Sequence, residues 1–357
     1  MSHQLSVSAR GQALERFAMA SFDRIVIVTR KTALTELVER FNTVSQARFY
    51  LEQSVGAGAF TEYQAAHDAY QRAIETLERA LPGGYRTHWI DRSFVPTYLF
   101  GPNDLVVALG QDGLVVNIAK YLNGQPVIAL NPDPSRIDGL LLPFHVTCGG
   151  RAFGCVLNPR GDSIPWTEIR MARAELQDGQ VLHAVNDLFI GQRTHISARY
   201  RITYRDHEES QISSGIIVST GAGSTGWHRS VVLGARAIAK GAEQWTGEPR
   251  RSKKSRRERR EEGVAATGAP PGGFSWDAPL LRFTVREPFP SRVSGTSIVE
   301  GEILEDESLG LLSQMPQNGV IFSDGVEEDY LGFNSGSVAR IGLSEKRLRL
   351  VRDEYVH

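Results

Sequence analysis

The sequence predicts a two-domain protein with an α/β N-terminal domain and a β-rich C-terminal domain. The chain has 357 residues, which is more than one hydrophobic core usually serves. Short apolar runs alternate with helical patterns over roughly the first 140 residues, as in a doubly wound parallel sheet. After Pro143 the pattern changes to short segments, several of which alternate polar and apolar residues. We therefore expect domains at 1–142 and 143–357.

The N-terminal domain is expected to begin with a strand followed by a helix. Residues 24–29 (RIVIVT) form a continuous apolar run, typical of a buried parallel strand, and residues 32–41 repeat apolar residues at helical spacing. A longer amphipathic helix is expected at 60–81, where Pro82-Gly83-Gly84 ends it. The remaining elements are expected to be two strands at 104–109 and 126–130, separated by a turn at 110–113 and a helix at 114–122.

The C-terminal half is expected to consist mainly of short strands, at 198–204, 281–285, 297–304, 320–323 and 338–343. Residues 337–352 show two strand-like runs around Ser344-Glu345, and this end of the chain is expected to be ordered and able to pack back on the N-terminal domain. Residues 247–273 contain Pro and Gly clusters and no apolar periodicity. We expect them to form an exposed, flexible insertion.

Charge is distributed unevenly along the chain. Residues 250–260 (RRSKKSRRERR) hold eight basic residues and one acidic residue. Without them the chain has 32 basic and 40 acidic residues, so its body is acidic. The basic run alone is compatible with a nucleic-acid patch or a localisation signal, but the flanking composition favours a solvated loop. Nucleic acid is therefore not expected to be the principal partner.

Composition places the protein in a reducing, aqueous compartment. No apolar run approaches the roughly 18 to 20 residues that cross a bilayer, so no membrane-spanning segment is expected. Cys148 and Cys155 provide neither a disulfide framework nor a zinc-binding spacing. We expect a cytoplasmic protein. Residues 1–22, with Arg10 and Arg16, also resemble a transit peptide, which leaves the mitochondrial matrix as the alternative.

The first candidate site is the Gly110-Gln111-Asp112-Gly113 turn. It lies between a buried strand and a helix, at the carboxyl edge of the predicted sheet, where open α/β sheets bind ligands. Glycines allow the backbone to approach a phosphate closely, and the start of the helix attracts anions. A carboxylate at Asp112 repels phosphate but can accept a proton from a hydroxyl. The alternative is an ordinary turn in which Asp112 caps the helix.

The second candidate is residues 221–226 (GAGSTG), formally a G-x-G-x-x-G between an apolar strand and a helix. A nicotinamide oxidoreductase would need a second strand ending in an acidic residue about 20 residues further on. The polar, basic insertion occupies that position. The glycine turn is therefore expected to bind phosphate or ribose without being a dehydrogenase fingerprint.

The third candidate is the pair Asn186-Asp187 in an apolar context. Adjacent amide and carboxylate groups offer donor and acceptor atoms in a partly buried place, which suits ribose hydroxyls or an adenine edge. Taken alone, the residues favour a turn before a strand.

Six segments in a fixed order together resemble the NAD kinase family, in particular its divergent mitochondrial-type branch. The resemblance extends over nearly the whole chain from about residue 22. The segments are 105–115 (LVVALGQDGLV), 127–142 (VIALNPDPSRIDGLLL), 184–191 (AVNDLFIG), 213–227 (SSGIIVSTGAGSTGW), 281–288 (LRFTVREP) and 323–325 (SDG). The chain departs from the family pattern at Gln111, which replaces a glycine, at Leu114, which replaces a threonine, and at Gly226, which replaces an alanine.

The resemblance implies transfer of the γ-phosphoryl group of ATP, or of polyphosphate, to the 2′-hydroxyl of the adenosine ribose of NAD. It implies Asp112 as the catalytic proton acceptor. It implies substrate contacts at Gly110, Gly113, Asn131, Arg136, Asn186, Asp187, Gly223, Ser224, Thr225 and Trp227. For Trp227 the alternative is a side chain that fills the core. Mg²⁺ is expected to arrive with the donor, and no residue is assigned as its ligand.

The same resemblance implies a Rossmann-like N-terminal domain, a β-sandwich-like C-terminal domain, an active site between them and a homodimer or larger oligomer. Two other functions stay open. A diacylglycerol or sphingoid-lipid kinase shares the glycine and aspartate turn, but Asn186-Asp187 suits a nucleotide acceptor better. A catalytically silent nucleotide-binding protein is compatible with Gln111 and Leu114. Sequence leaves the preference for NAD or NADH open.

Overall fold

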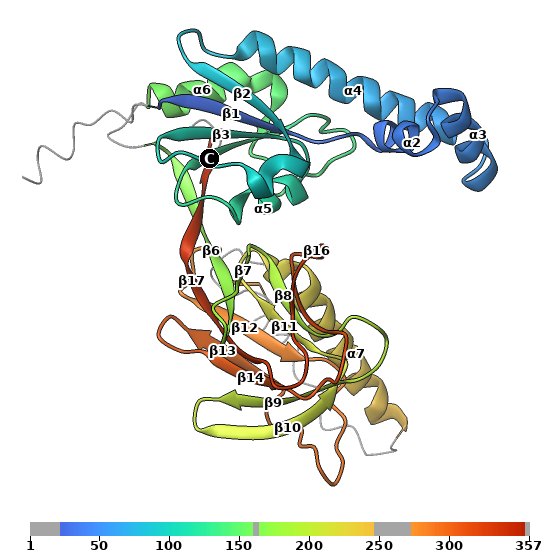
Figure 1. The fold of residues 1–357 in the computed structure, drawn as a ribbon, viewed down its shortest axis with the longest axis vertical. Helices are drawn as coiled ribbons and strands as arrows, with labels where there is room; N and C mark the ends of the chain where they lie inside the picture. Colours follow the sequence, from blue (N-terminus) through green and yellow to red (C-terminus); the bar gives the residue numbers. More distant parts are fainter. Residues whose placement is uncertain (1–21, 160–163, 246–272, 354–357) are drawn as a thin grey trace, which may run out of the picture. The chain divides into compact units, whose positions relative to one another are not determined.

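The computed structural model describes residues 22–159, 164–245 and 273–353 (Figure 1). The chain divides into two compact units. Unit 1 runs from the N-terminus to Thr167 and includes the chain again from Leu348, whereas unit 2 comprises Glu168–Arg347.

Unit 1 is built on a parallel sheet whose strands lie in the order β4-β3-β1-β2. These strands are β1 (Arg24–Thr29), β2 (Arg86–Asp91), β3 (Asp104–Leu109) and β4 (Pro126–Asn131), and the short β5 (Phe144–His145) pairs with the end of β4. Every residue of β3 and β4 is buried, which explains their continuous apolar sequences. The edge strand β2 is mostly exposed and carries no such pattern, so the sequence did not predict it.

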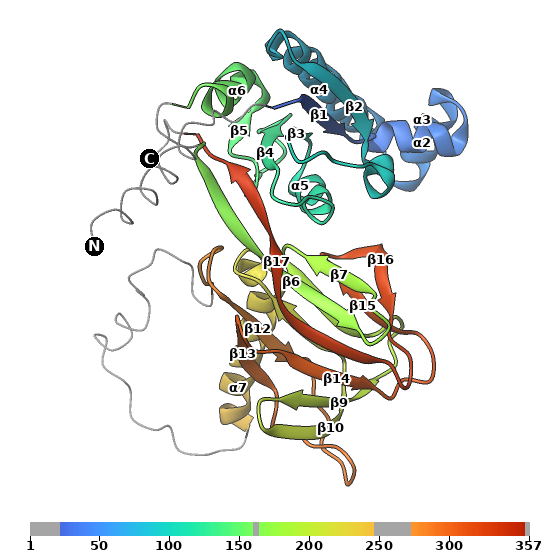
Figure 2. The same ribbon diagram turned by 60° about the vertical axis from the view of Figure 1, so that its left-hand side comes forward.

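Helices cover both faces of this sheet. Figures 1 and 2 show α4 (Ala59–Ala80) and α6 (Gly149–Leu157) on one face and α5 (Asp112–Ala119) on the other. Two shorter helices, α2 (Ala33–Phe41) and α3 (Val44–Ser54), precede α4. Thr32 begins α2 by accepting the backbone N–H of Thr35 at 3.2 Å. The 3₁₀ helices η2 (Arg92–Thr97) and η3 (Val146–Cys148) complete unit 1.

The division between the units lies after Thr167, whereas the sequence predicts it after residue 142. The reason is that β5, η3 and α6 belong to the first hydrophobic core. Phe144, Val146 and Phe153 pack there with Ile27 and Leu109 of the parallel sheet. The last residues of the chain return to the same unit, where Leu350 lies opposite Val127 of β4 in parallel pairing.

Unit 2 is a sandwich of two antiparallel sheets. One sheet has the order β10-β9-β14-β17, with β6 beside β17 and β7 beside β6; the other has the order β13-β12-β11-β8-β15-β16. Side chains from both sheets form one core, for example Ile202 and Leu311 from the first and Leu188, Phe283 and Ile321 from the second. Helix α7 (Trp227–Trp245) packs on β11 and β12 of the second sheet.

The strands of unit 2 are β6 (Trp166–Leu176), β7 (Val181–Ala184), β8 (Asp187–Gln192), β9 (Ala198–Tyr204), β10 (His207–Ser213), β11 (Ile216–Ser219), β12 (Leu280–Val285), β13 (Glu300–Leu304), β14 (Leu309–Ser313), β15 (Gly319–Ser323), β16 (Val326–Gly332) and β17 (Val338–Val351), and η4 (Gly223–Thr225) precedes α7. The predicted fold class, α/β followed by a β-sandwich, is confirmed. The two runs expected at the C-terminal end are one continuous strand, β17.

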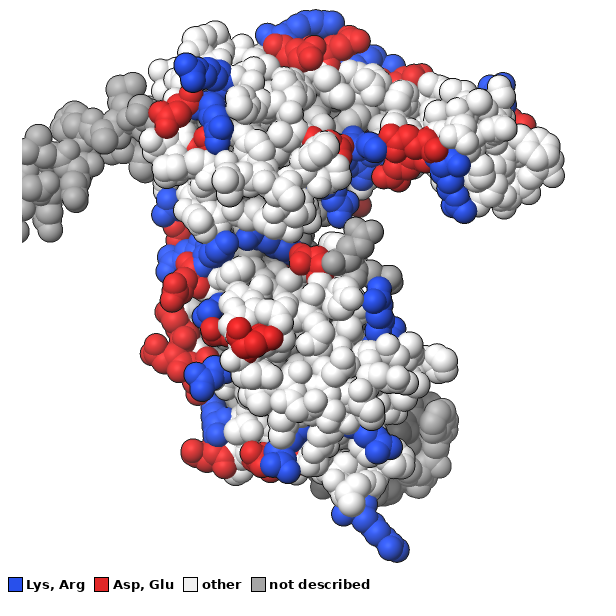
Figure 3. All heavy atoms as spheres, viewed as in Figure 1, with Lys and Arg blue, Asp and Glu red and all other residues white. Residues whose placement is uncertain are grey.

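None of the helices in the described ranges is long and apolar enough to cross a bilayer. On the face shown in Figure 3, basic and acidic side chains are interspersed in each unit. Residues 1–21 and 246–272, which include nearly all of the transit-like segment and of the expected insertion, lie outside the described residues.

Candidate functional site

The turn after β3 in unit 1 is closely packed around Gly110. A Cβ atom at this position would lie 2.8 Å from Cδ2 of Leu114 and 3.5 Å from Cδ of Arg30. Leu114 is 2% exposed, so its side chain fills the core beneath the turn. A side chain at Gly110 would therefore force Leu114 to shift, and Leu114, which stands where the family pattern has threonine, is a core residue. Gly113 is different, because the space around its missing side chain is open.

Asp112 connects this turn to a distant part of the chain. It is half-buried at the first position of α5, where its two carboxylate oxygens accept the backbone N–H groups of Leu140 at 3.0 Å and Leu141 at 2.9 Å. The N-cap residue is Gln111, whose side chain makes no capping bond. Asp112 therefore does not act as the helix cap that the simpler interpretation predicted.

Asn131 is the last residue of β4 and Arg136 lies in the loop after it, but their hydrogen bonds are made within this segment itself. Asn131 is 3% exposed, donates from Nδ2 to the carbonyl of Ile137 at 2.8 Å, and accepts the N–H of Asp133 at 3.0 Å. The guanidinium of Arg136 contacts Oδ2 of Asp133 at 2.5 Å. Burial would raise the pKa of Asp133, but hydrogen bonds from Ser135 and Arg136 outweigh it and lower the pKa. Arg136 is thus already paired with a carboxylate.

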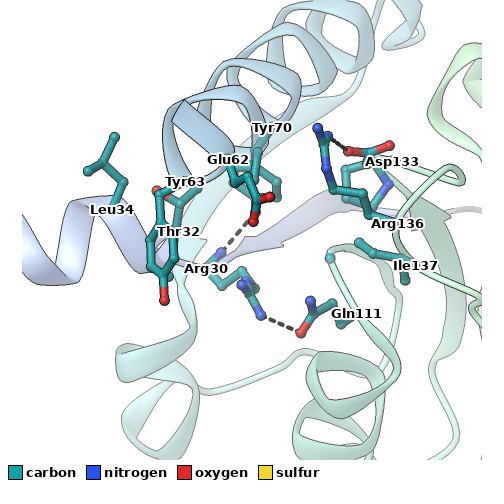
Figure 4. Close-up of a pocket in the computed structure, with 14 residues that line it drawn as sticks. Arg30, Thr32, Leu34, Glu62, Tyr63, Tyr70, Gln111, Asp133, Arg136 and Ile137 are labelled. Carbon is teal, nitrogen blue, oxygen red and sulfur yellow. Dashed lines mark hydrogen bonds and ion pairs between the residues drawn. The ribbon is translucent and has the colours of Figure 1, made fainter. Parts of the chain in front are cut away.

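A pocket of about 500 Å³ opens at this carboxyl edge of the sheet (Figure 4). Two of the predicted site residues, Gly110 and Arg136, line it. Sequence reasoning missed the rest of the lining, which includes Arg30, Thr32, Leu34, Glu62, Tyr63, Tyr70, Gln111 and Ile137. The signal was present at Arg30, because it follows β1 in the way that Gly110 follows β3.

In unit 2, a carboxylate that the sequence analysis did not assign to the site organises the Asn186-Asp187 segment. Asp324 accepts the backbone N–H groups of Val185 at 3.1 Å, Asn186 at 2.6 Å and Asp187 at 3.3 Å. The N–H of Asp324 donates in return to the carbonyl of Asp187 at 2.9 Å. The segment 323–325 was part of the family resemblance, so the sequence contained the signal for this residue.

Burial, together with the negative charge of Asp324, raises the pKa of Asp187 to about 7. Within the described residues, the side chains of Asn186 and Asp187 make no hydrogen bond. Both residues are half-buried at the start of β8. Their polar atoms are therefore available to a ligand, whereas their backbone is fixed by Asp324.

The glycine turn of unit 2 packs against the same segment. A Cβ atom at Gly223 would overlap the carbonyl oxygen of Asn186, so only glycine fits there. Ser224 is fully buried, and its hydroxyl donates to the carbonyl of Gly221 at 2.7 Å and accepts the N–H of Phe274 at 3.2 Å. Gly223 and Ser224 thus hold the turn in place. Thr225 follows them and is half-buried.

Trp227 lies at the start of α7 with 38% of its surface exposed. It stacks on Phe189 of β8, with ring centroids 5.5 Å apart and an interplanar angle of 20°. The guanidinium of Arg286 lies 5.5 Å from the centroid of the Trp227 ring. The side chain therefore packs on Phe189 of β8 and is still partly exposed.

Solved structures of known enzymes have the same fold. A yeast NADH kinase complexed with NADH superimposes with a TM-score of 0.54 and 15% identity, covering 93% of this chain and 84% of that one. An NAD kinase from Archaeoglobus fulgidus in complex with ATP has a TM-score of 0.52 and 14% identity, covering 93% and 94%. This chain has the NAD kinase fold. No family model and no curated protein matches the sequence.

On this NAD kinase fold, the predicted site residues form two groups. Unit 1 holds Gly110, Asp112, Gly113, Asn131 and Arg136 around the ends of β3 and β4, and unit 2 holds Asn186, Asp187, Gly223, Ser224, Thr225 and Trp227 around the starts of β8 and α7. Within each group the structure brings together residues far apart in sequence, as the contact of Gly223 with Asn186 shows.

Proposed function

We propose that this protein is a kinase that transfers the γ-phosphoryl group of ATP to the 2′-hydroxyl of the adenosine ribose of NAD, giving NADP. The observation that carries the proposal is the placement of an aspartate-containing glycine turn at the carboxyl edge of the parallel sheet, on an NAD kinase fold. Solved enzymes with this fold have been captured with NADH and with ATP.

The acceptor side of the reaction is assigned to unit 2. The unpaired side-chain atoms of Asn186 and Asp187 offer a donor and acceptors to the ribose or adenine of NAD. Because Asp187 has a pKa of about 7, it can donate as well as accept near neutral pH. The partly exposed ring of Trp227 could stack on a planar ring of NAD, and Thr225 lies two residues before it, at the end of η4.

Asp112 is assigned the transfer of the hydroxyl proton. The ribose oxygen would form a bond to the γ-phosphorus as the bond to the bridging oxygen of the leaving diphosphate breaks, and the hydroxyl proton would pass to Asp112. Each carboxylate oxygen has a second lone pair beyond the one used by Leu140 or Leu141, so it can also accept a hydroxyl. Such a base contributes about 10² to 10⁴ in rate, with positioning and charge neutralisation supplying the rest.

The donor side is assigned to the pocket of unit 1, whose lining includes Gly110 and Arg30. Among the described residues, no three or more His, Cys, Asp or Glu side chains are grouped so that they could hold a metal ion. Mg²⁺ would instead be held by the phosphate oxygens of the donor and by water, the arrangement usual for this ion. Its contribution would be to neutralise charge on the transferred phosphoryl group.

The test is incubation of the full chain with ATP, Mg²⁺ and NAD, followed by measurement of NADP. The proposal predicts NADP in stoichiometric amounts with ADP, formed at least about 10² times more slowly by Asp112→Asn. Binding of NAD without NADP would instead indicate a silent nucleotide-binding protein, an alternative favoured by the use of both Asp112 oxygens in backbone hydrogen bonds. Phosphorylation of a diacylglycerol or sphingoid base in place of NAD would indicate a lipid kinase.

Two further parts of the proposal concern the state of the protein in the cell. A homodimer or larger oligomer and a cytoplasmic location, with the mitochondrial matrix as the alternative, stay predictions. Sedimentation of the purified chain and fractionation of cells that express it would test them.

A further inference from the structure

The pocket of unit 1 contains two guanidinium groups in different electrostatic situations. Arg136 is paired with the carboxylate of Asp133 at 2.5 Å. Arg30 donates from Nη1 to a neutral acceptor, Oε1 of Gln111, at 2.6 Å, and has no carboxylate partner among the described residues. The positive charge of Arg30 is therefore uncompensated within the described part of the pocket, whereas that of Arg136 is offset.

Arg30 is also held at its backbone. Its N–H donates to the hydroxyl of Tyr70 at 3.0 Å, and that hydroxyl donates to the carbonyl of Leu109 at 2.8 Å. Tyr70 thus joins the ends of β1 and β3, and the stem of Arg30 passes over Gly110, where a Cβ atom would lie 3.5 Å from its Cδ. Figure 4 shows Arg30 and Gln111 meeting across the pocket beneath Tyr63 and Glu62. A guanidinium fixed in this way loses little further freedom when it binds an anion.

We propose that Arg30 binds the phosphate groups of the phosphoryl donor, and that Gln111 is the positioning residue that holds its guanidinium over the pocket. This inference rests on the proposed function and assigns the phosphate contact to Arg30 rather than to Arg136. It also explains why glutamine is useful at position 111, where the family pattern has glycine, because a glycine there would leave Arg30 without its amide partner.

Glu62 is the second acidic residue that lines the pocket, besides Asp133. It makes no ion pair among the described residues, and its negative charge would repel a bound anion.

The inference is tested by calorimetric titration of the full chain with inorganic tripolyphosphate and, separately, with ATP, both without NAD. Arg30→Gln is expected to weaken tripolyphosphate binding about tenfold or more, because one charge-assisted hydrogen bond is lost. The matched variant Arg136→Gln is expected to weaken it by less than about threefold, because its charge is already offset. Equal effects of the two variants would overturn the assignment.

Gln111 is tested by exchanging its amide for a carboxylate of the same shape. Gln111→Glu should turn the neutral contact into an ion pair with Arg30 and weaken binding of both anions about tenfold, whereas Glu62→Gln should strengthen it. Gln111→Gly should weaken binding about threefold and raise the KM for the donor with little change in kcat. Unchanged or tighter binding by Gln111→Glu would overturn the positioning role. Each variant is first checked for an unchanged melting temperature.

The phosphoryl donor can be a nucleoside triphosphate or inorganic polyphosphate. Only the first has a base and a ribose that could contact Tyr63 in the apolar part of the pocket. If the natural donor is a nucleoside triphosphate, ATP binds more tightly than tripolyphosphate, and Tyr63→Ala removes that advantage without affecting tripolyphosphate. If it is inorganic polyphosphate, Tyr63→Ala affects neither. The failure of the proposed function is distinguishable, since absence of NADP formation leaves the dependence of anion binding on Arg30 and Gln111 intact.

Discussion

Asp187 and Asp324 lie near enough in unit 2 for the charge of Asp324 to raise the pKa of Asp187. Asp324 accepts the backbone N–H of Asp187 and of its two predecessors, and burial with this neighbouring charge raises the pKa of Asp187 to about 7. A carboxylic acid with such a pKa changes its charge in the physiological range, which makes it both a stability determinant and a ligand group sensitive to pH.

The raised pKa predicts that unit 2 loses stability as the pH rises. The unfolded chain releases the proton of Asp187 near its ordinary pKa of about 3.9, whereas the folded chain retains it up to about 7. The contribution of Asp187 to the free energy of unfolding is therefore complete below about pH 4 and is lost as the pH rises through about 7. Urea unfolding at pH 5 and pH 8 should show it. Asp187→Asn should be less pH-dependent and more stable than the wild type at pH 8, and the exposed Asp206→Asn should behave like the wild type.

Asp324→Asn is predicted to weaken NAD binding without affecting ATP binding. An amide can accept hydrogen bonds through one oxygen only, so at least one of the N–H groups of Val185, Asn186 and Asp187 would lose its partner. The expected cost in stability is about 1 to 3 kcal/mol. Calorimetry with each nucleotide measures the effect, and a fall in ATP affinity alone would place this segment on the donor side.

Asn186→Ala is predicted to lower the affinity for NAD about tenfold and to leave the melting temperature nearly unchanged, because the side chain bonds to no described residue. Fluorescence titration with NAD and a thermal melt on one preparation provide both quantities. A large loss of stability with normal NAD affinity would show that Asn186 is structural.

Asp112→Asn is predicted to reduce kcat about 10² or more while NAD still binds. The contacts with Leu140 and Leu141 add a second effect. The amide nitrogen of asparagine cannot accept an N–H, so one backbone donor would lose its partner. The expected cost is about 1 kcal/mol, because the N–H of the exposed Leu140 can bond to water instead. Turnover must therefore be measured well below the lowered melting temperature. Retention of more than about a third of the wild-type kcat would exclude Asp112 as the proton acceptor.

The two glycines of the unit 1 turn are predicted to respond differently to the same methyl group. Gly110→Ala should destabilise the fold by about 1 to 3 kcal/mol, because its Cβ would press on Leu114. Gly113→Ala should stay within about 0.5 kcal/mol of the wild type, since its surroundings are open. If Gly113 borders a bound nucleotide, its variant will raise a KM without lowering stability. Equal destabilisation would contradict the packing described at Gly110.

The sequence predicted those features that depend on neighbouring residues. The buried strands β1, β3 and β4 have continuous apolar runs, α4 ends before Pro82, and the turn at Gly110 lies between β3 and α5, as expected. These features follow from local periodicity and from breaking residues, which a single sequence displays directly.

Contacts between distant residues were beyond sequence reasoning. Asp112 bonds to the backbone of Leu140 and Leu141, and nothing in the spacing of these residues predicts that contact. Arg136 was expected to meet phosphate, but its nearest anion is Asp133, which the local turn brings to it. The place of Arg30 after β1 is visible in the sequence, but its contact with Gln111 is not. Gln111 lies on another strand-to-helix connection, and only the parallel pairing of β1 with β3 brings the two residues together.

The position of strand β17 in the chain affects when unit 1 can finish folding during translation. Leu350 and Val351, near the end of the chain, are buried in unit 1, whose other residues are synthesised first. Domains usually fold as they leave the ribosome, the N-terminal one first. Here unit 1 cannot complete its sheet until the whole of unit 2 has been translated, because the last segment of β17 pairs with β4. A chain that terminates just after unit 2 would therefore have a destabilised unit 1, although the rest of that unit is synthesised first.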